Sequence, residues 1–459
     1  MQLVAYGAQD IYLTGNPQIT FFKVVYRRHT NFSMEAIEQT FNGGEDFGKS
    51  VSATISRNGD LVHRMYLEHK VVLARVNDKD MYVTANYGHR LIKEVELEIG
   101  GQRIDKHYGH WMSVWSQLTE PNPSGHSGDA GTASDAVQNA DSGKRTLFDK
   151  MSGNGLGCFQ QDGNNTDNLE IGAFTLPDEN GAAAVQTNIT GKMFIPLQFW
   201  FCRNPGLALP LIALQYHEVK VKMTFNNIGD LFLLDGDADP SGSIGLHSTA
   251  TPSTKEFKLF ADYIYLDTDE RRRFAQVSHE YLIEQVQHAA YNSSTDTAFS
   301  LNFNHPVKEL VWSRILPEGS TLVTPTFDDS TTTIKTGSEA TIASENWTLK
   351  LNGHERFKAR NTKYFTRTQI WQHHTGYGST INSDAIAVYS FALKPEEHQP
   401  SGTCNFSRID NAELSGPVSI DSSSTPTPGN HSAGGYNIYA VNYNVLRIMS
   451  GMGGLAYSN

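Results

Sequence analysis

The residues whose spacing most directly suggests chemistry are Gly43 to Ser50, which read GGEDFGKS. They fit the phosphate-binding pattern G-x-x-x-x-G-K-[ST], in which a glycine-rich turn leads into a helix whose free N–H groups bind phosphate. Apolar runs that end at Asp235 and Asp267 resemble the metal-binding strand of such a site. The residues after Ser50, however, alternate in polarity and include β-branched types, which is typical of a strand. We therefore predict a hairpin turn at this motif instead of a nucleotide site.

No other set of residues indicates a metal, a cofactor or a nucleophile. His107 and His110 are three residues apart and His373-His374 are adjacent, but neither pair has carboxylate or cysteine partners at zinc-site spacings. The three cysteines form no CxxC pair, which disfavours a disulfide framework and favours a reducing compartment. No G-x-S-x-G elbow occurs. We predict no catalytic residues, no cofactor and no metal.

The overall composition excludes further classes of protein. The 459 residues carry a formal net charge of −12, with 19% charged and 10% aromatic residues, which is a globular composition. This acidic balance argues against nucleic-acid or anionic-membrane binding, because both need a basic surface. The N-terminus does not read as a signal peptide, and the apolar runs are too short to span a bilayer.

The elements that must position any site are mostly strands. Alternating runs predict one set of strands before residue 270, at 19–26, 34–41, 49–55, 61–73, 91–99, 193–202, 215–225 and 256–267. A second set follows at 280–288, 298–304, 308–315, 347–351, 356–359, 386–393, 403–414 and 437–449. Residues 108–118 predict a short amphipathic helix with Trp111 and Trp115 on one face, and the charged segment 267–276 predicts one or two helical turns.

One pattern occurs twice. Residues 97–104 read LEIGGQRI, and residues 349–357 read LKLNGHERF. Each is a short alternating strand, a glycine turn, an arginine and another apolar residue. We therefore predict that the turn glycines Gly101 and Gly353 occupy equivalent turns in the two copies, where a β-branched residue would hurt folding if φ is positive. A period of about 250 residues is too long for a solenoid and indicates two copies of one domain.

The strand pattern and the repeat together predict the fold. Eight short strands in each half indicate a sandwich or a jelly roll, and two tandem eight-stranded jelly-roll barrels would account for both the length and the repeat. We therefore expect an all-β protein of this kind, with short helices and long surface loops. The predicted boundaries are an N-terminal arm at 1–18, a first jelly roll at 19–267 with a long loop insertion at 119–192, a connecting segment at 268–278 and a second jelly roll at 279–459.

Asn-x-Ser/Thr sequons are the remaining candidate sites. Those at Asn164, Asn188, Asn292 and Asn430 fall in predicted loops and are chemically possible glycosylation sites. For any one of them, an unmodified asparagine is the favoured interpretation, because no signal peptide directs the chain to the glycosylation machinery.

Several long, collinear segments resemble the major capsid proteins of nucleocytoplasmic large DNA viruses, of the chlorella-virus (phycodnavirus) type. They are 6–32, 55–61, 95–108, 204–220, 262–285, 301–306, 399–414 and 442–457. The resemblance implies a double jelly roll, and a homotrimer that forms a pseudo-hexagonal capsomer of a large icosahedral virion. It further implies minor capsid proteins on the inner face, only indirect contact with an internal membrane, and synthesis in the host cytoplasm.

Three hypotheses follow, the first of them with a variant. The first is a structural major capsid protein without catalytic residues, and its variant is a minor capsid paralogue with the same fold. The second is a nucleotide hydrolase that uses Lys49 and Ser50. The third is a surface-binding module, such as an attachment or carbohydrate-recognising protein with its site in the loops.

Overall fold

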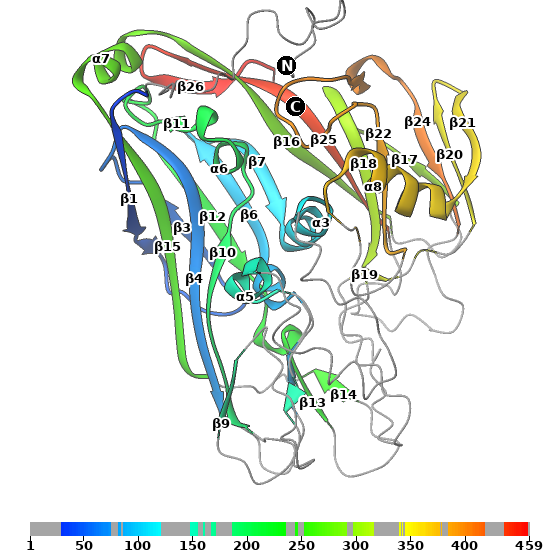
Figure 1. Cartoon of the computed structure of the whole chain (residues 1–459), viewed down its shortest axis with the longest axis horizontal. Coiled ribbons are helices and arrows are strands. Elements are labelled where there is room, and N and C mark those ends of the chain that lie inside the picture. The colour runs from blue at the N-terminus through cyan, green and yellow to red at the C-terminus, as the bar shows by residue number, and fades with distance from the viewer. Residues whose placement is uncertain are drawn as a thin grey trace, which may run out of the picture.

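The computed structural model shows two β-rich halves side by side, with the strands of both halves running roughly along the same direction (Figure 1). The structure describes residues 29–74, 81–83, 86–120, 147–154, 159–160, 167–170, 186–235, 244–246, 252–291, 297–315, 339–340, 342, 345–376, 378, 384–417 and 436–457. The predicted strand at 19–26 and the predicted arm at 1–18 lie outside these ranges.

The first half consists of two main sheets and a smaller one. One main sheet has the order β1 (Phe32–Gln39), β15 (Pro252–Leu266), β4 (Leu61–Ala74), β10 (Gln186–Pro196) and β9 (Asp167–Glu170), and β11 (Leu209–Pro210) also pairs with β4. The other has the order β2 (Phe41–Asn42), β3 (Ser50–Thr54), β12 (Val219–Phe225), β6 (Ile92–Ile99) and β7 (Gln102–Tyr108). The smaller sheet joins β14 (Ile244–Leu246), β13 (Phe232–Asp235), β5 (Met81–Val83) and β8 (Phe159–Gln160).

The second half has two sheets. One has the order β16 (His279–Tyr291), β25 (Tyr436–Met449), β18 (Pro306–Ile315) and β19 (Glu339–Ala340), with β22 (Ile386–Ser390) and β23 (Cys404–Asn405) also paired to β18 and β26 (Met452–Leu455) paired to β25. The other has the order β17 (Ala298–Ser300), β24 (Ala412–Ser415), β20 (Asn346–Leu351) and β21 (His354–Asn361).

Both halves have the same topology. The main strands of the first half, taken along the chain, are β1, β3, β4, β6, β7, β10, β12 and β15; those of the second are β16, β17, β18, β20, β21, β22, β24 and β25. When each set is numbered from 1 to 8, both halves give sheets of order 1-8-3-6 and 2-7-4-5. The shared order confirms the predicted all-β, double jelly-roll fold.

Strand alternation produces a separate core between the two sheets of each half. In β6, Val95, Leu97 and Ile99 are buried, while Glu94 and Glu96 face outward. Val95, Leu97 and Ile99 belong to one apolar cluster, whereas Trp312 and Trp347 belong to a second cluster within the second half. Each half therefore buries its own apolar interior, as expected of one sheet face packed on a core and the other left free.

The short helices connect and cover the sheets. They are α2 (Tyr87–Leu91), α3 (Gly109–Thr119), α5 (Leu147–Ser152), α6 (Trp200–Arg203), α7 (Thr268–Gln276) and α8 (Gln369–His373), with a π-helix, η4 (Tyr364–Thr368), directly before α8. The 3₁₀ turns are η2 (Pro205–Leu207), η3 (Ile228–Asp230) and η5 (Phe406–Arg408). The helices predicted at 108–118 and 267–276 are confirmed as α3 and α7, and Asp267 caps α7 by accepting a hydrogen bond from the Thr268 N–H.

Two sequence predictions are wrong in detail. The strand predicted at 193–202 ends at Pro196, and residues 200–203 form α6, because the apolar run there is buried as a whole instead of alternating. The segment 119–192, predicted as one long loop, contains α5, β9 and the start of β10 within its described part. These elements lack a clear polarity period, which is the signal that strand and helix prediction needs.

The repeated glycines lie in matching hairpins. Gly100 and Gly101 have φ of 60° and 83° and join β6 to β7. Asn352 and Gly353 have φ of 50° and 79° and join β20 to β21. Two-residue loops with positive φ at both positions match the twist of antiparallel strands, and they favour Asn-Gly and Gly-Gly.

The Gly353 turn gives a direct stability prediction. A Cβ at this position meets no atom within 4 Å, so a substitution tests the backbone conformation alone. We expect Gly353→Val to lower the free energy of unfolding by about 1–2 kcal/mol, because left-handed φ crowds a β-branched side chain. Gly353→Asn is the matched control and should cost less, since asparagine tolerates this region. Equal urea midpoints for the two variants would contradict the prediction.

Candidate assembly surfaces

The phosphate-loop motif lies in a β-hairpin. Its residues connect β2 to β3, and Ser50 is the first residue of strand β3 instead of entering a helix. Asp46 forms an ion pair with Lys255 at 2.6 Å, and the Ser50 and Thr224 hydroxyls hydrogen-bond at 2.9 Å. The motif therefore lacks the helix N-terminus on which a phosphate loop depends.

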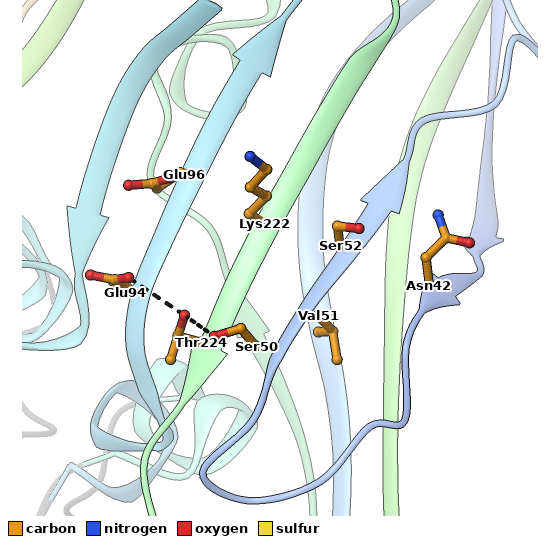
Figure 2. A pocket seen from close by; sticks show the side chains of 8 residues that line it. All are labelled: Asn42, Ser50, Val51, Ser52, Glu94, Glu96, Lys222 and Thr224. Atoms are coloured by element: carbon orange, nitrogen blue, oxygen red, sulfur yellow. Dashed lines mark hydrogen bonds between the residues drawn. The ribbon is translucent and has the colours of Figure 1, made fainter. Parts of the chain in front are cut away.

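Ser50 lines a hollow of about 300 Å³ on the outer face of this sheet (Figure 2). Glu94 and Glu96 point outward beside it, and both form ion pairs with Lys106, at 2.7 and 3.2 Å. Lys222, the cation at the centre of the hollow, pairs with Glu98. Lys106, Lys222 and Lys255 are thus already paired with carboxylates, and this arrangement disfavours phosphate binding.

Of the histidines singled out in the sequence, His107, His110 and His374 are packed within the fold, whereas His373 is half-buried. His107 is buried against Asp105, and its ring stacks on Phe199. His110 hydrogen-bonds the Tyr439 hydroxyl at 2.7 Å, and burial lowers the pKa of His110 to about 3. Within the described ranges, no group of three or more His, Cys, Asp or Glu side chains is arranged to hold a metal ion. Among the same residues, no helix has the length and apolar character to cross a membrane.

The candidate glycosylation sites fall in different places. Asn188 lies in strand β10, where it pairs with Ala74 of β4, so its predicted loop position is wrong. A strand forms there because the residues after Asn188 continue the ladder with β4. Asn164, Asn292 and Asn430 lie outside the described residues. Glycosylation of these asparagines therefore stays a prediction.

The junction between the halves is built around α3. This helix follows β7 of the first half and packs on the outer face of the second half, in one apolar cluster with residues of β18, β22 and β25. The Trp111 and Tyr439 rings are 5.0 Å apart, and Trp111 is only 2% exposed. Beyond the helix, the Gly376 N–H donates to the Leu118 carbonyl at 2.7 Å. These contacts hold the two jelly rolls together as one unit.

A buried charge cluster completes this junction. Glu284 of β16 accepts hydrogen bonds from Arg203 of α6 and Lys308 of β18, each at 2.6 Å. The Lys308 side chain is fully buried and that of Glu284 is 4% exposed. Burial raises the pKa of Glu284, but Arg203, His398 and Lys308 together lower it to about 2. The carboxylate is therefore charged at neutral pH and links the first half to two elements of the second.

His374 forms a second buried ionic contact at the same junction. Its Nε2 donates to Glu309 and its Nδ1 donates to Glu396, both at 3.0 Å. Burial lowers the pKa of the His374 ring, but the two carboxylates outweigh burial and raise it to about 9. The ring also lies edge-on to Trp115 of α3. Sequence reasoning missed both clusters, although the polar pair Lys308-Glu309 inside the apolar run of β18 was a signal.

A larger hollow lies beside the junction. Its volume is about 810 Å³, and residues from both halves line it. Tyr66, Phe194 and Pro196 from the outer sheet face form one wall, and Trp115 and Glu120 at the end of α3 form another. A half-buried row of aromatic side chains beside a concave surface is typical of an association site.

Comparisons with known proteins agree with this architecture. The family described as "Major capsid protein N-terminus" matches residues 20–267, and "Large eukaryotic DNA virus major capsid protein" matches residues 270–454. The major capsid protein of Pyramimonas orientalis virus is 48% identical, over 100% of this chain and 99% of the relative. That of Paramecium bursaria Chlorella virus 1 is 40% identical over the same shares.

Solved structures agree with the sequence comparisons. The chain in the quasi-atomic model of the PBCV-1 virus capsid superposes with a TM-score of 0.69 at 35% identity, covering 96% of this chain and 100% of that one. These relatives are structural proteins of capsids and not enzymes. On the duplicated jelly-roll topology and these matches, the chain belongs to the major capsid protein family of large eukaryotic DNA viruses.

Proposed function

We propose that three copies of this chain form a homotrimer that serves as a pseudo-hexagonal capsomer of a large icosahedral shell. The observation that supports this most directly is the identical strand order of the two halves. A chain with two similar units yields six similar corners in a three-fold assembly, and six corners are what hexagonal packing requires. A closed ring also covers surfaces that would otherwise support open-ended association.

The junction supports the same proposal. Because α3 and the two ionic clusters fix the halves relative to one another, one chain supplies two adjacent corners in a set geometry. We further propose that neighbouring capsomers and minor capsid proteins of the inner face are its partners in the virion. An internal membrane would be contacted only indirectly, and synthesis would take place in the host cytoplasm.

Light scattering on the purified protein at micromolar concentration tests the proposal. We expect a single species of three times the chain mass that sediments as a compact particle. Electron microscopy of that species should show an outline with six corners. A protein that remains monomeric at micromolar concentration would contradict the capsomer proposal.

A further inference from the structure

We propose that Trp371 of α8 docks on the outer sheet face of the first jelly roll of a second copy, at the apolar row of Phe260, Tyr66 and Pro196. The inference rests on the proposed trimer and specifies its contact. It follows from the internal duplication: the contact that α3 makes within one chain is repeated by α8 between chains.

The sheet faces of the two halves can be aligned residue by residue. At the start of β4, Val62 pairs with Leu209 of β11; at the start of β18, Val307 pairs with Cys404 of β23. Soon after these pairs, both β4 and β18 have a register irregularity against their long neighbours β15 and β25. The shared pairing and the shared irregularity make Tyr66 of β4 the counterpart of Val311 of β18.

Neighbouring strands extend this match into a row. Tyr66 pairs with Phe260 on one side and Pro196 on the other. Val311 likewise pairs with Tyr439 on one side and Val388 on the other. The row in the first half is therefore Phe260, Tyr66 and Pro196, and its counterpart in the second half is Tyr439, Val311 and Val388.

Only one of the two rows is covered. In the second half, α3 lies over the row, and Tyr439, Val311 and Val388 are at most 1% exposed. In the first half, all three counterparts are only partly buried, and the row adjoins the hollow of about 810 Å³. The Tyr66 ring stacks on Phe260 with centroids 5.4 Å apart, which leaves an apolar aromatic surface next to that hollow.

The second half carries the matching helix. In each half, a helical segment follows the strand after the repeated turn: α3 after β7, and η4 with α8 after β21. Near their ends, α3 contains WSQLT (115–119), and the chain at the end of α8 reads WQHHT (371–375). Trp115 is 4% exposed, whereas Trp371 is 80% exposed and makes no ring contact within the described residues. Trp371 of α8 is therefore exposed, whereas its counterpart Trp115 of α3 is buried.

Charged groups lie on both of the proposed contact surfaces. Lys363, Arg367 and Trp371 are all exposed, and Arg367 is already paired with Asp384 at 2.6 Å. The hollow beside the row is lined by Arg64 and Arg203 and by the carboxyl groups of Glu120 and Asp262. Burial raises the pKa of both groups, so an approaching cation would offset part of the cost of their desolvation.

A second copy of this chain is the partner that fits the uncovered row of the first half. Contact of α3 with the next jelly roll is heterologous, since one surface of the first half meets a different surface of the second. A heterologous contact repeated between chains forms a closed ring when the rotation allows it. With two units in each chain, a three-fold ring lets every outer sheet face be covered by the helix of its neighbour.

Disulfide trapping between copies tests this contact. A Trp371→Cys chain and a Tyr66→Cys chain, carrying different tags, are mixed under dissociating conditions, reassembled and oxidised mildly. We expect a covalent heterodimer on non-reducing gels. The matched control replaces Trp371→Cys with Met452→Cys, because Met452 of β26 is 53% exposed on the same half and should not cross-link to Tyr66→Cys.

A second measurement uses truncation. Trp371→Ala should raise the concentration of half-dissociation of the trimer at least tenfold, since a central aromatic anchor dominates such contacts. Met452→Ala should change it less than threefold. A wild-type trimer with no cross-link, together with equal effects of the two alanine variants, would overturn this contact and leave the capsomer proposal intact. A wild-type protein that is monomeric would contradict both this contact and the capsomer proposal.

Discussion

Glu284→Gln is expected to lower the free energy of unfolding by about 3–5 kcal/mol, the cost of leaving a buried charge without its partner. Lys308 is fully buried and loses the carboxylate that neutralises it, and Arg203 loses its 2.6 Å contact. The shift in the urea midpoint measures the effect. The matched control is Glu397→Gln, which breaks an exposed ion pair with Lys394 and should cost less than about 1 kcal/mol.

A double variant separates lost charge from lost packing. Glu284→Leu combined with Lys308→Met removes both buried charges, and we expect it to recover most of the stability lost in Glu284→Gln. Arg203 is 21% exposed, so its guanidinium can turn toward water in that background. If Glu284→Gln shifted the urea midpoint no more than Glu397→Gln does, the proposed contribution of this buried cluster to stability would be contradicted.

His374 is expected to make stability depend on pH in the alkaline range. Its pKa rises from the ordinary 6.5 to about 9, which corresponds to roughly 3 kcal/mol, since one pKa unit is worth about 1.4 kcal/mol. Because the folded state holds the proton more tightly, this contribution is complete below pH 6.5. It is lost as the pH rises through 9.

Comparison with His374→Gln isolates the contribution of this side chain. The variant should be less stable than the wild type at pH 6, and the difference should shrink steadily between pH 6.5 and 9.5. Urea unfolding at several pH values measures both proteins in the same buffers, so groups that titrate elsewhere cancel. A difference that stays constant across this range would show that the ring is neutral in the folded protein.

Much of the fold could be predicted because its signals are local. Alternation in β6 predicts which side chains enter the core, and the glycine at 353 predicts a turn. The duplicated segment further predicted that one domain occurs twice, which the shared strand order confirms. The segment 200–203 was predicted wrongly, because a helix buried all round has no polarity period to detect.

The side-chain contacts at the junction could not be predicted in the same way, because the residues that meet there are distant in the chain. Glu284 is 81 residues from Arg203, and His110 is 329 residues from Tyr439. Nothing in the neighbouring residues of either partner specifies such a pairing. The sequence by itself determined the two jelly rolls, their turns and the family, since alternation and turn chemistry act within a few residues. Only the tertiary structure decided which face is covered within the chain and which is left open, because burial depends on how distant strands and helices pack.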